Sequence, residues 1–155
     1  MLNQTVGAGF AARYEELGAR VAELAVPLTE EQFWRKPFPF GNSFGHLVLH
    51  LTGNLNYYLG TQIAGTGYVR NRDREFTEAS RPVKDEVMRR FAEGIALAAR
   101  TACAQTEQDW GRQYEAERDQ SENRFKIFLR CATHLHLHIG QMIYLKFALE
   151  KGSEL

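Results

Sequence analysis

Apolar residues recur at helical spacing along most of this chain of 155 residues. Before Pro27 the repeat is formed by Phe10, Tyr14, Leu17, Val21 and Leu24. Residues at i, i+3, i+4 and i+7 share one face of a helix, so this repeat predicts an amphipathic helix over about residues 6–26. Residues 29–32 (Thr-Glu-Glu-Gln) then form a capping box, which predicts a short helix that carries Phe33 and Trp34.

Three further apolar repeats predict three more long helices. They span about residues 43–64, 82–106 and 121–149. Asn42 or Ser43 can cap the first of them. Pro82 suits the first turn of the second, and Ser121 can cap the third. The segment that starts at Asp109 is interpreted as a polar connection. Because no segment alternates apolar and polar residues as a strand does, the expected fold class is all-α with four main helices.

The connection between the second and third long helices, residues 65–81, is too long for a tight turn. Its roughly 17 residues can extend over about 55 Å, whereas a helix of about 22 residues is about 33 Å long. The connection can therefore run back along the whole bundle, so that the two helices it joins point the same way. The sequence thus predicts a single domain, residues 1–155, folded as an up-down-down-up four-helix bundle with one long crossover.

Composition excludes several classes of function. Hydrophobic residues make up 44% of the chain and charged residues 25%, and the 19 basic residues equal the 19 acidic ones. Since no basic patch is visible, nucleic acid is not an expected partner. No run of apolar residues is long enough to span a membrane, and the N-terminus lacks a signal-peptide pattern. Cys103 and Cys131 are expected to be reduced thiols of a cytoplasmic protein.

All five histidines fall in two short segments of the predicted helices. The second long helix carries His46 and His50, and the fourth carries His134 and His138 at the same spacing of four residues. Side chains at i and i+4 lie on one helix face. Two such pairs on facing helices can therefore bind one divalent metal ion through neutral imidazole nitrogens. The spacing leaves either histidine of the first pair as a ligand, although His50 lies one turn deeper. His46 is expected at the mouth of the site or in contact with a ligand, and simple exposure to solvent is the alternative.

Other residues near these histidines are candidates for supporting roles. His136 points away from the face that its two neighbours share, so it is not expected to be a ligand. If the charged crossover passes the metal, Asp73 or Glu75 can act as a hydrogen-bond acceptor or a base; a solvated loop with local ion pairs is the alternative. The amides of Asn54 and Gln141, each about one turn beyond a candidate ligand, can orient a ligand or a water molecule.

Two motifs contain the candidate ligands: His-Leu-x-Gly-Asn at residues 50–54 and His-x-x-x-His-x-Gly-Gln at residues 134–141. A segment before the second helix, 29–34 (Thr-Glu-Glu-Gln-Phe-Trp), and a crossover segment, 72–76 (Arg-Asp-Arg-Glu-Phe), accompany them. With these features the chain resembles the DinB/YfiT-like superfamily of small bacterial four-helix proteins, over essentially its whole length. The resemblance implies an up-down-down-up bundle, in agreement with the argument from the length of the crossover.

The resemblance also implies a metal site and a function. Its ligands would be His50, His134 and His138, and the ion would be zinc or nickel. Three imidazoles leave a coordination position open, so that the ion can activate a thiol or a water molecule. Characterised members of the superfamily include thiol-dependent transferases. The first hypothesis is therefore a metal-dependent transferase or hydrolase that acts on a small molecule, with a low-molecular-weight thiol as a candidate substrate.

Two other hypotheses stay open at this point. In one, the protein is a non-catalytic, stress-associated, metal-binding bundle that acts as a homodimer or through a partner. In the other, the histidines are purely structural. For the enzyme hypothesis the sequence offers only Asp73, Glu75 and His46 as candidates for catalytic residues beyond the metal ligands.

Overall fold

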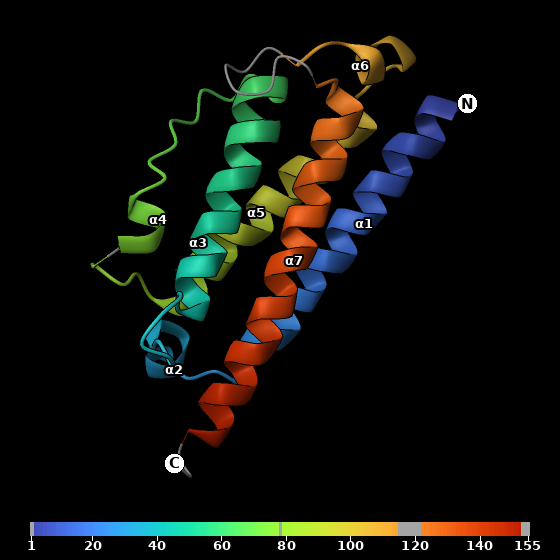
Figure 1. Ribbon diagram of the computed structural model, residues 1–155. Coiled ribbons are helices and arrows are strands. Elements are labelled where there is room, and N and C mark those ends of the chain that lie inside the picture. The colour runs from blue at the N-terminus through green and yellow to red at the C-terminus, as the bar shows by residue number, and fades with distance from the viewer. Residues whose placement is uncertain (1, 78, 115–121, 153–155) are drawn as a thin grey trace.

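The computed structural model describes residues 2–77, 79–114 and 122–152, and these form an all-α structure without a strand (Figure 1). The helices are α1 (Leu2–Ala25), α2 (Glu30–Trp34), α3 (Phe44–Leu55), α4 (Arg74–Thr77), α5 (Lys84–Cys103), α6 (Glu107–Gly111) and α7 (Arg124–Lys151). Helix α3 continues directly into a π-helix, η1 (Asn56–Ala64). The predicted fold class is confirmed. None of the described helices is both long enough and apolar enough to cross a membrane.

Four long helical segments pack side by side around the core. Helix α1 contacts α5 and α7, and α3 contacts the same two helices, so each long segment has two long neighbours. In the view of Figure 1, α1 and α7 run downward, whereas α5 and α3 with η1 run upward. The crossover from η1 to α5 therefore returns along the molecule, and its short helix α4 packs against α3. This path brings the charged residues of the crossover beside His50 of α3.

Large aromatic side chains connect the helices through one core. Tyr14, Phe33, Phe44, Phe91 and Phe128 come from α1, α2, α3, α5 and α7, and all five are almost completely buried. A ring of this kind buries roughly 150–250 Å² of surface. Because α3 and α7 share this core, their facing sides are held in a fixed relationship.

The caps of α2 and α3 set the position of the first metal-ligand candidate. The Thr29 hydroxyl accepts from the backbone N–H of Gln32 at 3.2 Å, and the Gln32 side chain accepts from the Thr29 N–H at 3.0 Å, which is the predicted capping box. Ser43, rather than Asn42, caps α3: its hydroxyl accepts from the backbone N–H of the third helical residue at 3.1 Å. With 3.6 residues per turn, His50 lies about two turns beyond this cap.

The boundaries of α5 differ from the prediction at both ends. Val83 is the N-cap and Lys84 the first helical residue, so Pro82 precedes the helix instead of lying in its first turn. The helix also ends earlier than predicted, at Cys103. It ends there because Thr106, three residues later, caps a second helix.

The interpretation of the segment from Asp109 as a polar connection was wrong, because this residue lies in helix α6. Thr106 caps α6: its hydroxyl accepts from the Asp109 backbone N–H at 3.2 Å, and the Asp109 carboxylate accepts from the Thr106 N–H at 3.0 Å. The helix buries Trp110 against the core. Helix α7 is capped by Asn123, whose side-chain oxygen accepts from the Lys126 N–H at 3.0 Å. The predicted cap, Ser121, lies outside the described residues.

The last part of the second predicted helix is a π-helix. In η1 the backbone hydrogen bonds run from i to i+5 instead of i to i+4, a pattern that is frequent at functional sites. The element ends at Gly65, whose φ of 69° lies in the left-handed region that glycine adopts without strain. Tyr58, inside η1, lines a cavity next to the histidine cluster.

Candidate metal centre

Three histidines from two neighbouring helices converge on one point. His50 extends from α3, and His134 and His138 extend from α7. The Nε2 atom of His134 is 3.2 Å from His50 Nε2 and 3.0 Å from His138 Nε2. His50 is buried and the other two are half-buried. The structure thus brings together the three residues that the resemblance implied as ligands.

Hydrogen bonds at the far side of two rings turn the Nε2 atoms toward one another. His50 Nδ1 is 2.8 Å from Glu75 Oε2, and His138 Nδ1 is 2.7 Å from Gln141 Oε1. Because both partners are acceptor oxygens in this arrangement, each Nδ1 carries the hydrogen and donates it. A neutral imidazole protonated at Nδ1 presents a lone pair at Nε2. At least two lone pairs therefore face the centre of the cluster.

This donor set fits a divalent transition ion. Since the Nε2 atoms of His50 and His138 carry lone pairs, only His134 can donate a hydrogen bond within the cluster, and it can donate to just one of them. The repulsion between His134 Nε2 and the other lone pair remains. The other ring nitrogen of His134, Nδ1, is buried and has no hydrogen-bond partner among the described residues. Nitrogens bound tetrahedrally to zinc at about 2.0–2.1 Å lie about 3.3 Å from one another, close to the two Nε2 separations. The three-histidine group can therefore hold a metal ion.

The surroundings of His134 and His138 favour the neutral form that binds metal. Burial, together with the neighbouring rings of His138 and His50, lowers the pKa of His134 to about 4. Burial also lowers the pKa of His138, although its hydrogen bond to Gln141 opposes this effect. Imidazoles must be unprotonated at the ligating nitrogen to coordinate a cation. His134 and His138 thus present unprotonated imidazole nitrogens at neutral pH.

Glu75 lies behind His50 as a buried carboxylate. It accepts hydrogen bonds from Arg70 Nε at 2.6 Å and Arg70 Nη2 at 2.8 Å, as well as from His50. Burial alone would raise the pKa of Glu75, but the hydrogen bonds from His50 and Arg70 outweigh it and lower that pKa. Glu75 is therefore ionised and fixed, which suits it to orient His50.

The other residues considered from the sequence lie in different surroundings. Asp73 is exposed, and it is its backbone oxygen that accepts from the Thr77 hydroxyl, at 2.9 Å. His46 is buried, so the alternative of simple solvent exposure is wrong: its Nδ1 is 2.6 Å from Ser43 Oγ, and its ring packs edge-on against Trp34. His136 is exposed and points away from the cluster, as predicted; its Nδ1 lies 3.1 Å from an Arg13 nitrogen.

A cavity of about 260 Å³ adjoins the cluster, and His50 and His134 form part of its wall. The remaining lining residues are Asn54, Tyr58, Arg70, Arg72, Arg130 and Cys131. The guanidinium of Arg130 lies 4.7 Å from the centre of the Tyr58 ring. Asn54, one turn beyond His50, is buried. Sequence reasoning did not find Tyr58, Arg70 or Arg130, because they belong to three separate segments that only the fold brings together.

The comparisons with known proteins agree with this geometry. A sequence model of the DinB superfamily matches residues 13–142. This match includes all three histidines of the cluster and Glu75. The chain therefore belongs to the DinB superfamily. No curated protein matches the chain.

Proposed function

We propose that this member of the DinB superfamily is a metal-dependent enzyme whose single divalent ion is held by His50, His134 and His138. The observation that carries the proposal is the convergence of three Nε2 atoms at the wall of a cavity. Imidazole ligands suit zinc and nickel, among other transition metals. When bound, such an ion acts as a Lewis acid and can activate a thiol or a water molecule as the nucleophile.

The chain's own residues would orient the ligands. Glu75 accepts the Nδ1 hydrogen of His50, and Gln141 accepts that of His138. Such partners fix the tautomer and the ring orientation and increase the basicity of the ligating nitrogen. Arg70 in turn holds both oxygens of Glu75. This second layer of contacts favours a site built for metal over a chance cluster of histidines.

The cavity favours catalysis over metal storage and indicates the charge of the substrate. Arg70, Arg72 and Arg130 line it, and Arg70 is paired with the Glu75 carboxylate. The guanidinium of Arg72 lies 5.4 Å from the centre of the Phe76 ring, so its positive charge is placed at the wall of the cavity. Guanidinium groups recognise carboxylates through paired hydrogen bonds. We infer that the substrate is a small organic anion, for which a carboxylate-bearing low-molecular-weight thiol is the first candidate.

The cavity also suggests roles for two neutral side chains. Asn54 lies one turn beyond His50, so its buried amide can hydrogen-bond a polar group that approaches the ligand side of the cavity. Tyr58 supports the guanidinium of Arg130 by a cation–π contact. Both residues position a substrate without taking part in bond making.

A screen of thiol transfer tests the proposal. The zinc- and nickel-loaded proteins are each incubated with bacterial low-molecular-weight thiols and an electrophile, and thioether formation is followed by mass spectrometry. Turnover by the wild type, its loss in His50→Ala and its retention in His136→Gln would support a metal-dependent transferase. A stable, metal-loaded protein that catalyses neither thiol transfer nor hydrolysis of small esters and amides would favour the alternative, a non-catalytic metal-binding bundle.

The charge of the substrate is tested separately. Arg72→Gln should raise KM for carboxylate-bearing thiols at least about tenfold, since Arg72 lines the cavity and a charge-assisted hydrogen bond contributes roughly 1.5–3 kcal/mol. It should leave KM for an uncharged thiol such as 2-mercaptoethanol unchanged. An equal effect on both thiols would contradict the proposed role of the arginines while leaving the metal site intact.

A further inference from the structure

The outward face of α7 lacks formal charge over most of its length. Between Lys126 and Glu150, no exposed side chain of this helix is Asp, Glu, Lys or Arg. Leu137, Tyr144 and Phe147 are 62%, 77% and 54% exposed. The solvent face of a surface helix normally carries charged residues. A continuous uncharged face with projecting apolar side chains therefore indicates a surface that is covered by another molecule.

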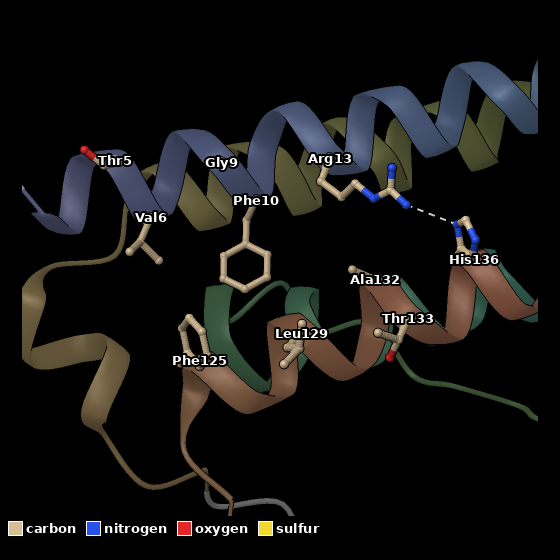
Figure 2. A pocket seen from close by; sticks show the side chains of 10 residues that line it. All are labelled: Thr5, Val6, Gly9, Phe10, Arg13, Phe125, Leu129, Ala132, Thr133 and His136. Carbon is tan, nitrogen blue, oxygen red and sulfur yellow. Dashed lines mark hydrogen bonds between the residues drawn. The ribbon is translucent and has the colours of Figure 1, made fainter.

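A groove between α1 and α7 lies beside the N-terminal half of this face (Figure 2). Its volume is about 500 Å³. Val6 and Phe10 of α1 line one side, and Leu129 of α7 lines the other. The hydrogen bond between Arg13 and His136 marks the polar end of the groove, as the dashed line in Figure 2 shows. The groove is otherwise mainly apolar and open to side chains of a partner.

Along α7, the groove residues and the projecting aromatic residues lie at equal distances on either side of His138. Leu129 lies nine residues before His138 and Phe147 nine residues after it, and Ala132 and Tyr144 lie six residues before and after it. A second α7, antiparallel to the first and related to it by a two-fold axis at the level of His138, places each aromatic residue against the groove of the other copy. A two-fold interface requires such self-complementarity.

We propose that this face is the interface of a homodimer, in which two α7 helices pack antiparallel and Tyr144 and Phe147 of each copy fill the groove of the other. His134 and His138 point toward α3, on a different side of α7, so the interface leaves the histidine cluster accessible. The inference does not rest on the proposed metal chemistry.

Charge and helix spacing support the same arrangement. Lys126 and Glu150 lie twelve residues before and after His138, have opposite charges, and their side chains are 58% and 42% exposed. Each makes an ion pair within its own helix, and such exposed pairs are weak. Antiparallel pairing brings Lys126 close to the partner's Glu150, whereas parallel pairing would bring like charges together. Near the axis, the open space around Gly140 allows the two helices to approach closely.

The oligomeric state of the full chain tests the proposal. Sedimentation equilibrium should show a monomer–dimer equilibrium for the wild type. Tyr144→Glu and Phe147→Glu should each raise the dimer Kd about 30-fold or more, since each removes an aromatic anchor that fills the partner's groove. Val69→Glu is the matched control: Val69 is 87% exposed on the crossover, away from α7, and its substitution should leave Kd unchanged. A wild type that stays monomeric at millimolar concentration would overturn the proposal.

A charge-reversal cycle tests the antiparallel register. Lys126→Glu and Glu150→Lys should each weaken the dimer, because each places like charges opposite one another, and the double variant should restore it. Circular dichroism verifies that each variant keeps its helical content. Additive weakening in the double variant, or a dimer that Tyr144→Glu does not affect, would show that another surface forms the contact.

Discussion

The carboxylate of Glu75 occupies the space that a side chain at position 53 would fill: a β-carbon on Gly53 would lie 2.0 Å from Glu75 Oε1. The other carboxylate oxygen accepts from His50, three residues before Gly53 on the same helix. The glycine thus allows the crossover to approach α3 closely enough to support a metal-ligand candidate. This contact gives a physical reason for the glycine in the motif at residues 50–54.

Gly53→Ala should displace Glu75 from His50. The added methyl group cannot coexist with the carboxylate in its present position, so the free energy of unfolding should fall by about 1–3 kcal/mol, as in other overpacked sites. Metal affinity should fall about 10- to 100-fold, the usual effect of disturbing the partner of a ligating histidine. Urea unfolding and competition with a chromophoric chelator measure the two effects.

Gly9→Ala serves as the control for the same chemical change. The space around Gly9, in the interior of α1, is open, and alanine favours a helix over glycine by roughly 0.5–1 kcal/mol. At low protein concentration this variant should be slightly more stable than the wild type and should bind metal normally. Equal effects of the two substitutions would contradict the proposed role of the contact at Gly53.

Glu75→Gln should weaken metal binding without emptying the site. The amide oxygen can still accept from His50, but the negative charge that increases its basicity is lost, so we expect about a tenfold loss of affinity. Arg70, whose side chain is 10% exposed, loses its anionic partner, which should cost about 3 kcal/mol of stability. Asp73→Asn, on the same crossover but exposed, should change stability by less than about 0.5 kcal/mol.

Metal content separates the ligands from the other histidines. Protein purified without a histidine tag should contain one divalent transition ion per chain by mass spectrometry of the metals. His134→Ala should lose most of it, because two imidazoles make a poor site. His136→Gln and His46→Gln should retain it, since neither ring belongs to the cluster. Full retention in His134→Ala would refute the proposed ligand set.

The metal-free protein should lose stability in mildly acidic solution. The pKa of His134 is 6.5 in the unfolded reference and about 4 in the folded protein, so the unfolded chain binds more protons between these values. Its contribution is therefore fully present above pH 6.5 and declines as the pH falls toward about 4. His138, whose pKa is also lowered, acts in the same direction. Urea unfolding at several pH values, compared with His134→Gln, measures this contribution.

Metal binding should show the same dependence on pH. Protons compete with the ion for the three imidazoles, so occupancy at a fixed, near-stoichiometric metal concentration should fall as the solution becomes acidic. Equilibrium dialysis at pH 5, 6, 7 and 8 measures the occupancy. Occupancy that is constant over this range would indicate ligands other than histidine.

The elements with long apolar repeats were predictable from the sequence, and those set by a few local contacts were less so. The four long segments follow their periodicity because each buries one face in a shared core. Helix α6 was missed, although Thr106 and Asp109 stand at capping-box spacing, because Trp110 is its single buried apolar residue. The change from α3 to η1 leaves no mark in the apolar repeat, since it concerns backbone hydrogen bonds.

The residues of the candidate metal centre also differ in how far the sequence predicted them. The pairing of histidines at i and i+4 was visible in the sequence, and the superfamily motifs favoured His50 over His46. The sequence did not show whether Asp73 or Glu75 faces the site, because the crossover has no periodicity that predicts the direction of a side chain. Likewise, the contact between Arg130 and Tyr58 joins residues that are far apart in the sequence, on helices whose relative rotation only the fold defines.

In this small protein, one part of the chain holds the candidate metal ligands and another part, the crossover, shapes the cavity beside them. The two facing helices supply all three histidines, whereas the connection between η1 and α5 supplies Glu75, Arg70 and Arg72. Substitutions at the exposed positions of this connection, such as Arg72, can therefore alter which molecules the cavity accepts while the imidazoles stay where the core and Glu75 hold them. Such a separation lets one bundle diversify its chemistry through the exposed residues of a single surface segment.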